Sequence, residues 1–240
     1  MKFSCFFAAS FSVILSNLAI MAQQPAPALQ STSAAVHLGQ RSTLPIALET
    51  LPESTRMAVN KIMLQPTIKA AAPMEEFAST GDMYLWLLDH PDRVSLAWRR
   101  LKVEAVEIKM LRDGGFYWSD GQGSELTWHT IGKSGDGRIW LAEGKIRVGL
   151  LLPISIPVKA VAVLHHGIRK KENESKIRHQ VDVYLQTDSK AASMVSKILG
   201  PAAPRMAVQG AEQLQIFFSG IARYVDHHPQ SADVILAGKK

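Results

Sequence analysis

The sequence predicts an α+β domain in which a curved antiparallel sheet of about six or seven strands packs on a long C-terminal helix, with two helices near the start. Three observations predict it. Residues 103–186 contain repeated stretches of alternating apolar and polar residues, residues 205–228 carry an apolar stripe at helical spacing, and two short helical segments precede the strands. Short connections between the strands favour antiparallel pairing, with one buried face and one face exposed to water.

The first 22 residues have the order of a secretory signal peptide. Lys2 gives a basic start, residues 3–20 are almost wholly apolar or small, and Ala22 precedes a polar stretch. We expect cleavage after Ala22 and an exported protein, periplasmic or extracellular, with no stable membrane span after processing. The alternative is a retained membrane anchor, although several serines weaken a span. The only cysteine, Cys5, lies inside the signal, so the mature chain has no disulfide, and its position argues against a lipoprotein.

Composition divides the rest of the chain into one domain with short flanks. Residues 23–43 are rich in Gln, Pro, Ala and Ser, which is typical of a flexible leader. We expect an N-terminal helical extension over 44–64, the domain itself over 65–228, and a C-terminal tail over 229–240. No internal repeat or second linker is visible, and the mature length is sufficient for one domain with a full core.

Capping residues and periodicity place the individual elements. Pro73 allows a helix over 74–89, and Asp92 can cap a second helix that ends near Leu101. Pro153 and Pro157 predict an edge, a bend or a loop over 151–158. Strands are expected over residues 67–71, 103–110, 116–118, 125–131, 140–148, 159–168 and 176–186.

This order of elements, from about Gln65 to His228, resembles the START-like helix-grip superfamily of lipid-transfer and polyketide-cyclase-like domains. The resemblance rests on one short strand, two helices, about six antiparallel strands and a long final helix, rather than on a short motif. It implies a sheet that curls around the last helix, with a cavity between them for an apolar ligand. The segment 44–64 and the proline-broken stretch 151–158 depart from the family pattern.

Charge patterning argues against a nucleic-acid partner. The net charge of +6 falls to +5 when Lys2 is removed, and most basic residues are interleaved with acidic ones. The cluster over 169–174 is typical of a solvated hairpin tip, whereas nucleic-acid binding needs a stripe of one sign. Asn173 begins a glycosylation sequon, which matters only in a host that glycosylates.

Metal and nucleophile motifs are absent from the sequence. His165 and His166 point to opposite faces of one strand, so they cannot bind one metal ion together. His227 and His228 lie at a helix end, where histidine complements the helix dipole. Without His-x-x-x-His spacing or a Gly-x-Ser-x-Gly turn, we expect no metal site, no cofactor and no serine-hydrolase triad.

His179 is the most informative single residue, because it is the one titratable group on the dry face of its strand. It is either a core histidine bonded to a neighbour or a polar anchor or acid–base group for a ligand. Apart from Thr130, other inward polar residues are scarce, which favours binding over catalysis. Three functions remain open: binding of a hydrophobic or lipid-like small molecule, a cyclase- or hydrolase-like enzyme, and an interaction protein with a filled core.

The candidate ligand cavity lies between the dry face of the sheet and the final helix, which would act as its lid. Ala142 and Gly144 leave space at mid-strand, which a large side chain or a ligand fills. Trp128 and Trp140 are expected to be cross-strand neighbours that face the helix. The predicted cavity residues are His179, Trp128, Trp140, Ala142, Gly144, Ile146, Val148, Val181, Val183, Leu214, Phe217, Phe218 and Ile221.

Overall fold

The computed structural model describes residues 44–148, 154–171, 174–188, 190–193 and 200–238. The expected signal peptide, the leader and Asn173 lie outside the described residues. The helical elements, with η for 3-10 helices, are η3 (Leu48–Thr50), α2 (Glu53–Leu64), α3 (Gly81–Asp89), α4 (Pro91–Arg100), η4 (Gly200–Ala202), α6 (Ala203–His227), η5 (Pro229–Ser231) and α7 (Ala232–Leu236). The strands are β1 (Ile68–Ala71), β2 (Glu75–Ala78), β3 (Ile108–Met110), β4 (Phe116–Ser119), β5 (Glu125–Lys133), β6 (Gly137–Val148), β7 (Ile154–Lys171) and β8 (Glu174–Gln186).

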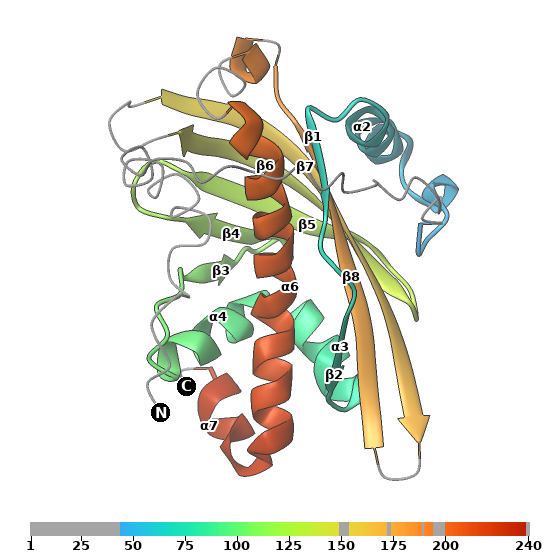
Figure 1. The fold of residues 1–240 in the computed structure, drawn as a ribbon, viewed down its shortest axis with the longest axis vertical. Coiled ribbons are helices and arrows are strands. Elements are labelled where there is room, and N and C mark those ends of the chain that lie inside the picture. Colours follow the sequence, from blue (N-terminus) through green and yellow to red (C-terminus); the bar gives the residue numbers. More distant parts are fainter. Residues whose placement is uncertain (1–43, 149–153, 172–173, 189, 194–199, 239–240) are drawn as a thin grey trace, which may run out of the picture.

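Eight strands form one antiparallel, curved sheet that does not close on itself. Its order is β1-β8-β7-β6-β5-β4-β3, and β2 pairs with β8 in line with β1. Helix α6 runs along the concave face, so the sheet grips it, as Figure 1 shows with α6 in red in front of the strands. The predicted α+β class and the helix-grip arrangement are therefore confirmed.

The main core lies between the concave face of the sheet and α6, and α3 and α4 close its lower part (Figure 1). Helix α6 buries one side because its apolar residues recur every three or four positions. Fully buried members of this core include Tyr84, Leu87, Leu88, Val94, Ile177, Val181, Ile221 and Ala222.

The convex face of the sheet carries a second, smaller core, so the expectation of one wholly wet face is wrong. Helix α2 buries Val59 and Ile62 against this face. The strand residues that receive them are Ile139, Val161, Val163 and Tyr184. The sequence indicates this contact only indirectly. The predicted N-terminal helix has an apolar side, which must pack against another apolar surface of the protein.

The helix expected over residues 74–89 is instead a strand followed by a shorter helix. Residues 75–78 form β2, whose Phe77 pairs with Ile177 of β8. Thr80 then caps α3, because its hydroxyl oxygen accepts a hydrogen bond from the backbone N–H of Met83 at 3.4 Å. Pairing with a free sheet edge here outweighs a local helical pattern, which is a weak preference.

Of the segment expected as an edge, a bend or a loop, residues 154–158 form an edge, because they pair with β6 alone, and residues 151–153 lie outside the described residues. β7 begins at Ile154 and continues through Pro157, which pairs with Lys145 of β6. Pairing with β8 begins only at Lys159, opposite Gln186. The Thr187 hydroxyl donates to the Pro157 carbonyl at 2.7 Å. The backbone carbonyl and nitrogen of Pro157 therefore face the side of β7 where β8 has already ended. Its missing N–H therefore removes no ladder hydrogen bond.

Two further expectations differ from the structure, one at strand β3 and one at the C-terminal end of the chain. Only residues 108–110 of the strand expected over 103–110 pair, because the neighbouring strand β4 is short. The segment after His228, expected as a tail, forms α7 and buries Ile235 and Leu236 in the main core. Arg100 of α4 fixes it by donating to two carbonyl oxygens of this segment, each at 2.7 Å.

Candidate functional site

An apolar cavity of about 370 Å³ lies between the concave face of the sheet and the N-terminal half of α6. Its volume is within the range of about 300–1,000 Å³ that is usual for small-molecule pockets. Strands β1, β3–β8 and helices α4 and α6 all contribute lining residues. The cavity is the candidate functional site of the described part of the chain.

Three alanines form the floor of the cavity. Ala142 of β6 lies directly opposite Ala160 of β7, and Ala162 lies opposite Trp140. All three side chains are on the concave face and line the cavity. Each occupies a position where a core strand would ordinarily carry a larger side chain, so space remains between the sheet and the helix.

The helix contributes small residues at the same level and large ones further along. Ala203, Ala207, Gly210 and Ala211 line the cavity from the first half of α6. Further along, Leu214, Phe217 and Phe218 also reach it, and Phe218 stacks on Trp140 with ring centroids 5.8 Å apart and an interplanar angle of 8°. Small residues predominate among the lining residues in the first half of α6, which also include Met206 and Gln213, so space remains there between the helix and the sheet.

Four of the five tryptophans in the chain line the cavity: Trp98, Trp118, Trp128 and Trp140. Trp98 is anchored to the lid, because its indole N–H donates to the Phe217 carbonyl at 3.0 Å. Gly220 permits this approach, since a Cβ there would meet the Trp98 ring at 2.5 Å. The aromatic walls are therefore tied to the position of α6.

The lining includes eight of the predicted cavity residues: Trp128, Trp140, Ala142, Ile146, Val183, Leu214, Phe217 and Phe218. Val181 and Ile221 are instead fully buried in the solid part of the core. The side chain of Val148 lies outside the described residues. Gly144 provides no space, because a Cβ there would overlap the backbone carbonyl oxygen of Glu125. The missing side chain allows β5 and β6 to approach closely instead.

Trp128 and Trp140 lie on the predicted face as cross-strand neighbours, although they are not directly opposite each other. Trp128 pairs with Ala142, and Trp140 pairs with Thr130, so the two indoles are diagonal neighbours. A bulge between Thr130 and Gly132 shifts the ladder by one residue. The turn residues alone could not reveal this extra residue.

Sequence reasoning missed Ala160 and Ala162 on the floor and Trp98 and Trp118 in the walls. The alternation in β7 carried a signal for the alanines, because residues 160, 162, 164 and 166 share one face. For Trp98 and Trp118 the sequence predicts only that each lies on the apolar side of a helix or a strand. Their convergence on one cavity depends on the tertiary arrangement.

His179 lies outside the cavity lining, in a buried polar cluster further along α6, which we call the Glu75 cluster (Glu75, Tyr84, His179, Ser219 and Arg223). The Nε2 of His179 is 2.8 Å from Glu75 Oε2, and its Nδ1 is 2.6 Å from the Tyr84 hydroxyl. Because an ionised carboxylate only accepts, Nε2 donates to Glu75, and in the neutral imidazole Nδ1 then accepts from the Tyr84 hydroxyl. His179 is thus a core histidine whose two ring nitrogens both form hydrogen bonds. This agrees with the first of the two interpretations of the sequence, a core histidine bonded to a neighbour.

Glu75 stays ionised despite its partial burial. Burial raises the pKa of its carboxyl, but hydrogen bonds from His179 and Ser219 and the charge of Arg223 outweigh this and lower the pKa to about 2. Burial, followed by the charge of Glu75, holds the pKa of Tyr84 well above its ordinary value. With Tyr84 and His179 both fully buried, the cluster offers no group to a ligand in the cavity.

His166, the partner of His179 across β7 and β8, is buried without a hydrogen bond to either ring nitrogen among the described residues. Burial, followed by the nearby Arg138 charge, lowers the pKa of His166 to about 4. Its ring lies edge-on to Tyr84, with centroids 5.8 Å apart. The residue is therefore neutral near pH 7.

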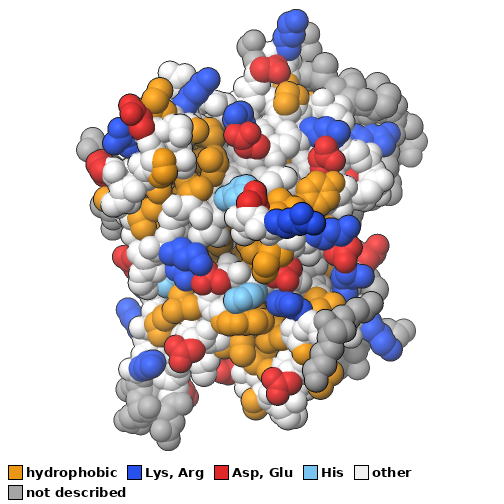
Figure 2. Space-filling view, turned by 180° about the vertical axis from the view of Figure 1, so that it is seen from behind, with side chains coloured by type: hydrophobic (Ala, Val, Ile, Leu, Met, Phe, Trp, Pro, Cys, Tyr) orange, Lys and Arg blue, Asp and Glu red, His pale blue; other side chains and the backbone are white. Residues whose placement is uncertain are grey.

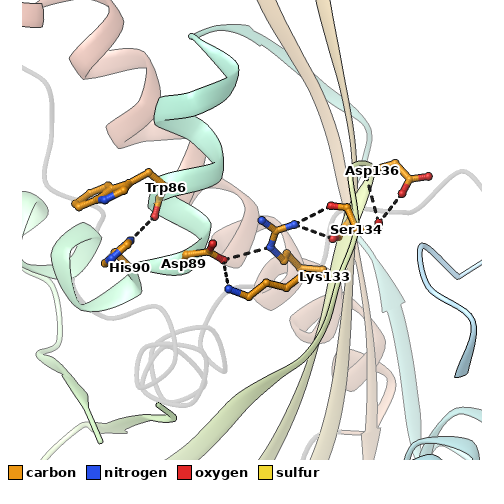
Figure 3. Close-up of polar contacts among 8 residues, drawn as sticks. Trp86, Asp89, His90, Lys133, Ser134 and Asp136 are labelled. Atoms are coloured by element: carbon orange, nitrogen blue, oxygen red, sulfur yellow. Dashed lines mark hydrogen bonds and ion pairs between the residues drawn. The ribbon is translucent and has the colours of Figure 1, made fainter. Parts of the chain in front are cut away.

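A second, partly exposed charge cluster lies where α3 ends beside the β5–β6 turn. Asp89 forms an ion pair with Lys133 at 3.0 Å and accepts a hydrogen bond from the buried Arg138 at 3.3 Å. Figure 3 shows Asp89 and Lys133 pointing toward each other across this junction, with Ser134 and Asp136 in the turn. These ion pairs join the end of α3 to the sheet.

Seen from behind, the surface carries basic and acidic side chains that are interspersed (Figure 2). Ion pairs between neighbouring strands join Lys159 with Glu143 at 2.9 Å and Lys145 with Glu125 at 3.1 Å. No single-sign field covers this face, and nothing on it indicates nucleic-acid binding. Within the described ranges no helix is long and apolar enough to cross a membrane.

No family model and no curated protein matches this chain in sequence. Several solved structures share elements of its fold. A conserved protein from Geobacillus kaustophilus is 10% identical over 64% of this chain and 96% of its own, with a TM-score of 0.38. A hypothetical protein from Helicobacter pylori is 9% identical over 66% and 89%, with a TM-score of 0.41. Truncated norcoclaurine synthase from Thalictrum flavum is 17% identical over 61% and 94%, with a TM-score of 0.31.

Proposed function

We propose that this protein binds a hydrophobic small molecule in the cavity between its sheet and α6. The observation that carries the proposal is the cavity itself, with a floor of alanines and walls that contain four tryptophans. An empty apolar space costs stability in proportion to its volume, because the side chains around it lack contacts. A ligand of complementary shape would restore those contacts.

Binding accounts for the cavity better than catalysis does. General acid–base chemistry needs a titratable group within hydrogen-bond reach of the substrate. The described lining contains no Asp, Glu, His, Lys, Arg or Tyr side chain. Tyr84, His179 and Glu75, which form the hydrogen-bonded chain most similar to a catalytic relay, are bonded to one another away from the cavity.

We propose further that residues 1–22 direct export of the chain and are removed after Ala22. The support is the basic start, the apolar core and the abrupt change to Gln23-Gln24-Pro25. Sequencing the N-terminus of the exported protein tests this directly. Retention of residues 6–20 in the mature protein would overturn it.

A cavity-filling variant tests the binding proposal. Ala160→Phe places an aromatic ring on the floor, and Lys159→Phe places the same ring on the neighbouring, half-exposed position of the same strand. Titration with the uncharged probe N-phenyl-1-naphthylamine is followed by quenching of the cavity tryptophans. We expect the wild type and Lys159→Phe to bind alike and Ala160→Phe to bind at least about tenfold more weakly. Equal binding by all three, or binding by none, contradicts the proposal.

A further inference from the structure

We infer that the cavity selects uncharged ligands and excludes ionised amphiphiles of either sign. This rests on the proposed function, since it specifies the chemistry of the molecule that the same cavity would take. The inference comes from three independent features of the described residues: the composition of the lining, the bonding of the polar groups at its edge, and the placement of the charge clusters.

The lining supplies no counterion. Among the described residues around the cavity, the side chains are aliphatic, aromatic or uncharged polar. An ion moved from water into such surroundings loses its hydration and gains no partner, so it either stays outside or gives up its charge by a proton transfer. A carboxylate or an ammonium group on the ligand would face this cost in full.

Gln186 and Thr187, two polar residues at the edge of the cavity, already form hydrogen bonds with other parts of the protein. Gln186 donates to the carbonyl oxygens of Lys61 and Gln65, at 3.3 and 3.2 Å. The Thr187 hydroxyl donates to Pro157, and its backbone N–H donates to the Thr67 hydroxyl at 3.2 Å. These bonds tie β8 to β7 and to the segment before β1. Solvating an ionised head group would require several of them to break.

The charge clusters described above lie elsewhere. Glu75 pairs with Arg223, and Asp89 pairs with both Arg138 and Lys133. Neither cluster contributes a residue to the cavity lining. Neither cluster therefore offers a counterion to a ligand in the cavity. An uncharged molecule, such as an alcohol or a hydrocarbon, meets none of these costs.

Three probes with the same twelve-carbon chain test the inference: 1-dodecanol, dodecanoate and dodecyltrimethylammonium. Each is titrated against the wild type loaded with N-phenyl-1-naphthylamine, and its displacement of that probe gives its affinity. We expect dodecanol to bind at least about 100-fold more tightly than dodecanoate at pH 7.5, because the acid must take up a proton to enter. That difference is expected to shrink about tenfold for each pH unit down to 5.5. The permanently charged ammonium probe should bind at least about 100-fold more weakly than dodecanol at every pH.

The outcomes separate this inference from the proposed function. Dodecanoate within threefold of dodecanol at pH 7.5, or a difference that does not change with pH, overturns the exclusion of anions. A tightly bound ammonium probe overturns the exclusion of cations and indicates recognition by the tryptophan faces. Failure of N-phenyl-1-naphthylamine itself to bind the wild type overturns the proposed function instead. Ala160→Phe serves as the background for all titrations, since its cavity is occupied by its own side chain.

Discussion

Glu75 is the residue on which the interior polar contacts of the domain converge. Its carboxylate joins β2 to His179 of β8 and to Ser219 and Arg223 of α6. Sequence reasoning placed it in a helix, so it identified His179 but could not find its partner. The chemistry of a single buried histidine is readable from strand periodicity, whereas the carboxylate that orients it depends on tertiary pairing.

The substitution Glu75→Gln is expected to destabilise the fold by about 1–3 kcal/mol, because it removes the charge that Arg223 and His179 require. Glu76→Gln is the matched control, since Glu76 is exposed on the same short strand. Urea unfolding at pH 7 measures both. The account of Glu75 is wrong if the two variants are equally stable.

His166 gives the domain a specific sensitivity to acid. Its folded pKa of about 4 lies below the ordinary value of 6.5, so between these values the unfolded chain binds a proton that the folded chain does not. Unfolding free energy therefore falls as pH drops from 6.5 to 4, by up to about 3 kcal/mol. Glu75 acts in a lower window, because its contribution is lost as pH falls from 4.5 toward 2.

His166→Leu should remove the loss of stability between pH 6.5 and 4 while leaving the decline below pH 4.5 in place. At pH 7 the variant is expected to be as stable as the wild type or more so, because neither ring nitrogen has a hydrogen-bond partner to lose among the described residues. Thermal unfolding over a pH series measures this. An unchanged slope between pH 6.5 and 4 would assign the acid sensitivity to another group.

At the scale of elements, long periodic segments were predictable and short ones were not. The alternation in β6 and β8 and the stripe in α6 identify both their type and their buried faces, because each pattern repeats over many residues. β2 has only four residues, and its identity depends on the free edge of β8. Pro157 indicated an edge, a bend or a loop, and the choice of an edge depends on where the neighbouring strand β8 ends, which the local sequence does not contain.

Gly144 tests the close approach of β5 and β6. Gly144→Ala would place a methyl group against the backbone of Glu125 and Leu126, so one strand must move, at an expected cost of about 1–3 kcal/mol. Gly167→Ala on β7 is the control, because a Cβ there meets nothing within 4 Å. Chemical denaturation of the two variants compares them. Equal stabilities would show that the strands accommodate a side chain at position 144.

At the scale of the whole molecule, the sequence predicts which faces meet but not how well they fill the space between them. Two dry surfaces, on the sheet and on α6, were identifiable from periodicity alone. The cavity arises because small residues from separate elements, Ala142 and Ala160 on the sheet and Ala207 on the helix, come to the same place. The volume of the cavity depends on how these elements are combined in the fold, so it cannot be predicted from any single stretch of sequence.

Native mass spectrometry of the gently purified protein tests the central claim, occupancy of this cavity, most directly. The wild type is expected to carry an additional mass of a small molecule that organic extraction removes and that an uncharged apolar probe restores. Ala160→Phe, purified in parallel, should show the bare protein mass throughout. A wild type that shows only its bare mass, and that takes up no apolar probe after extraction, would contradict the claim.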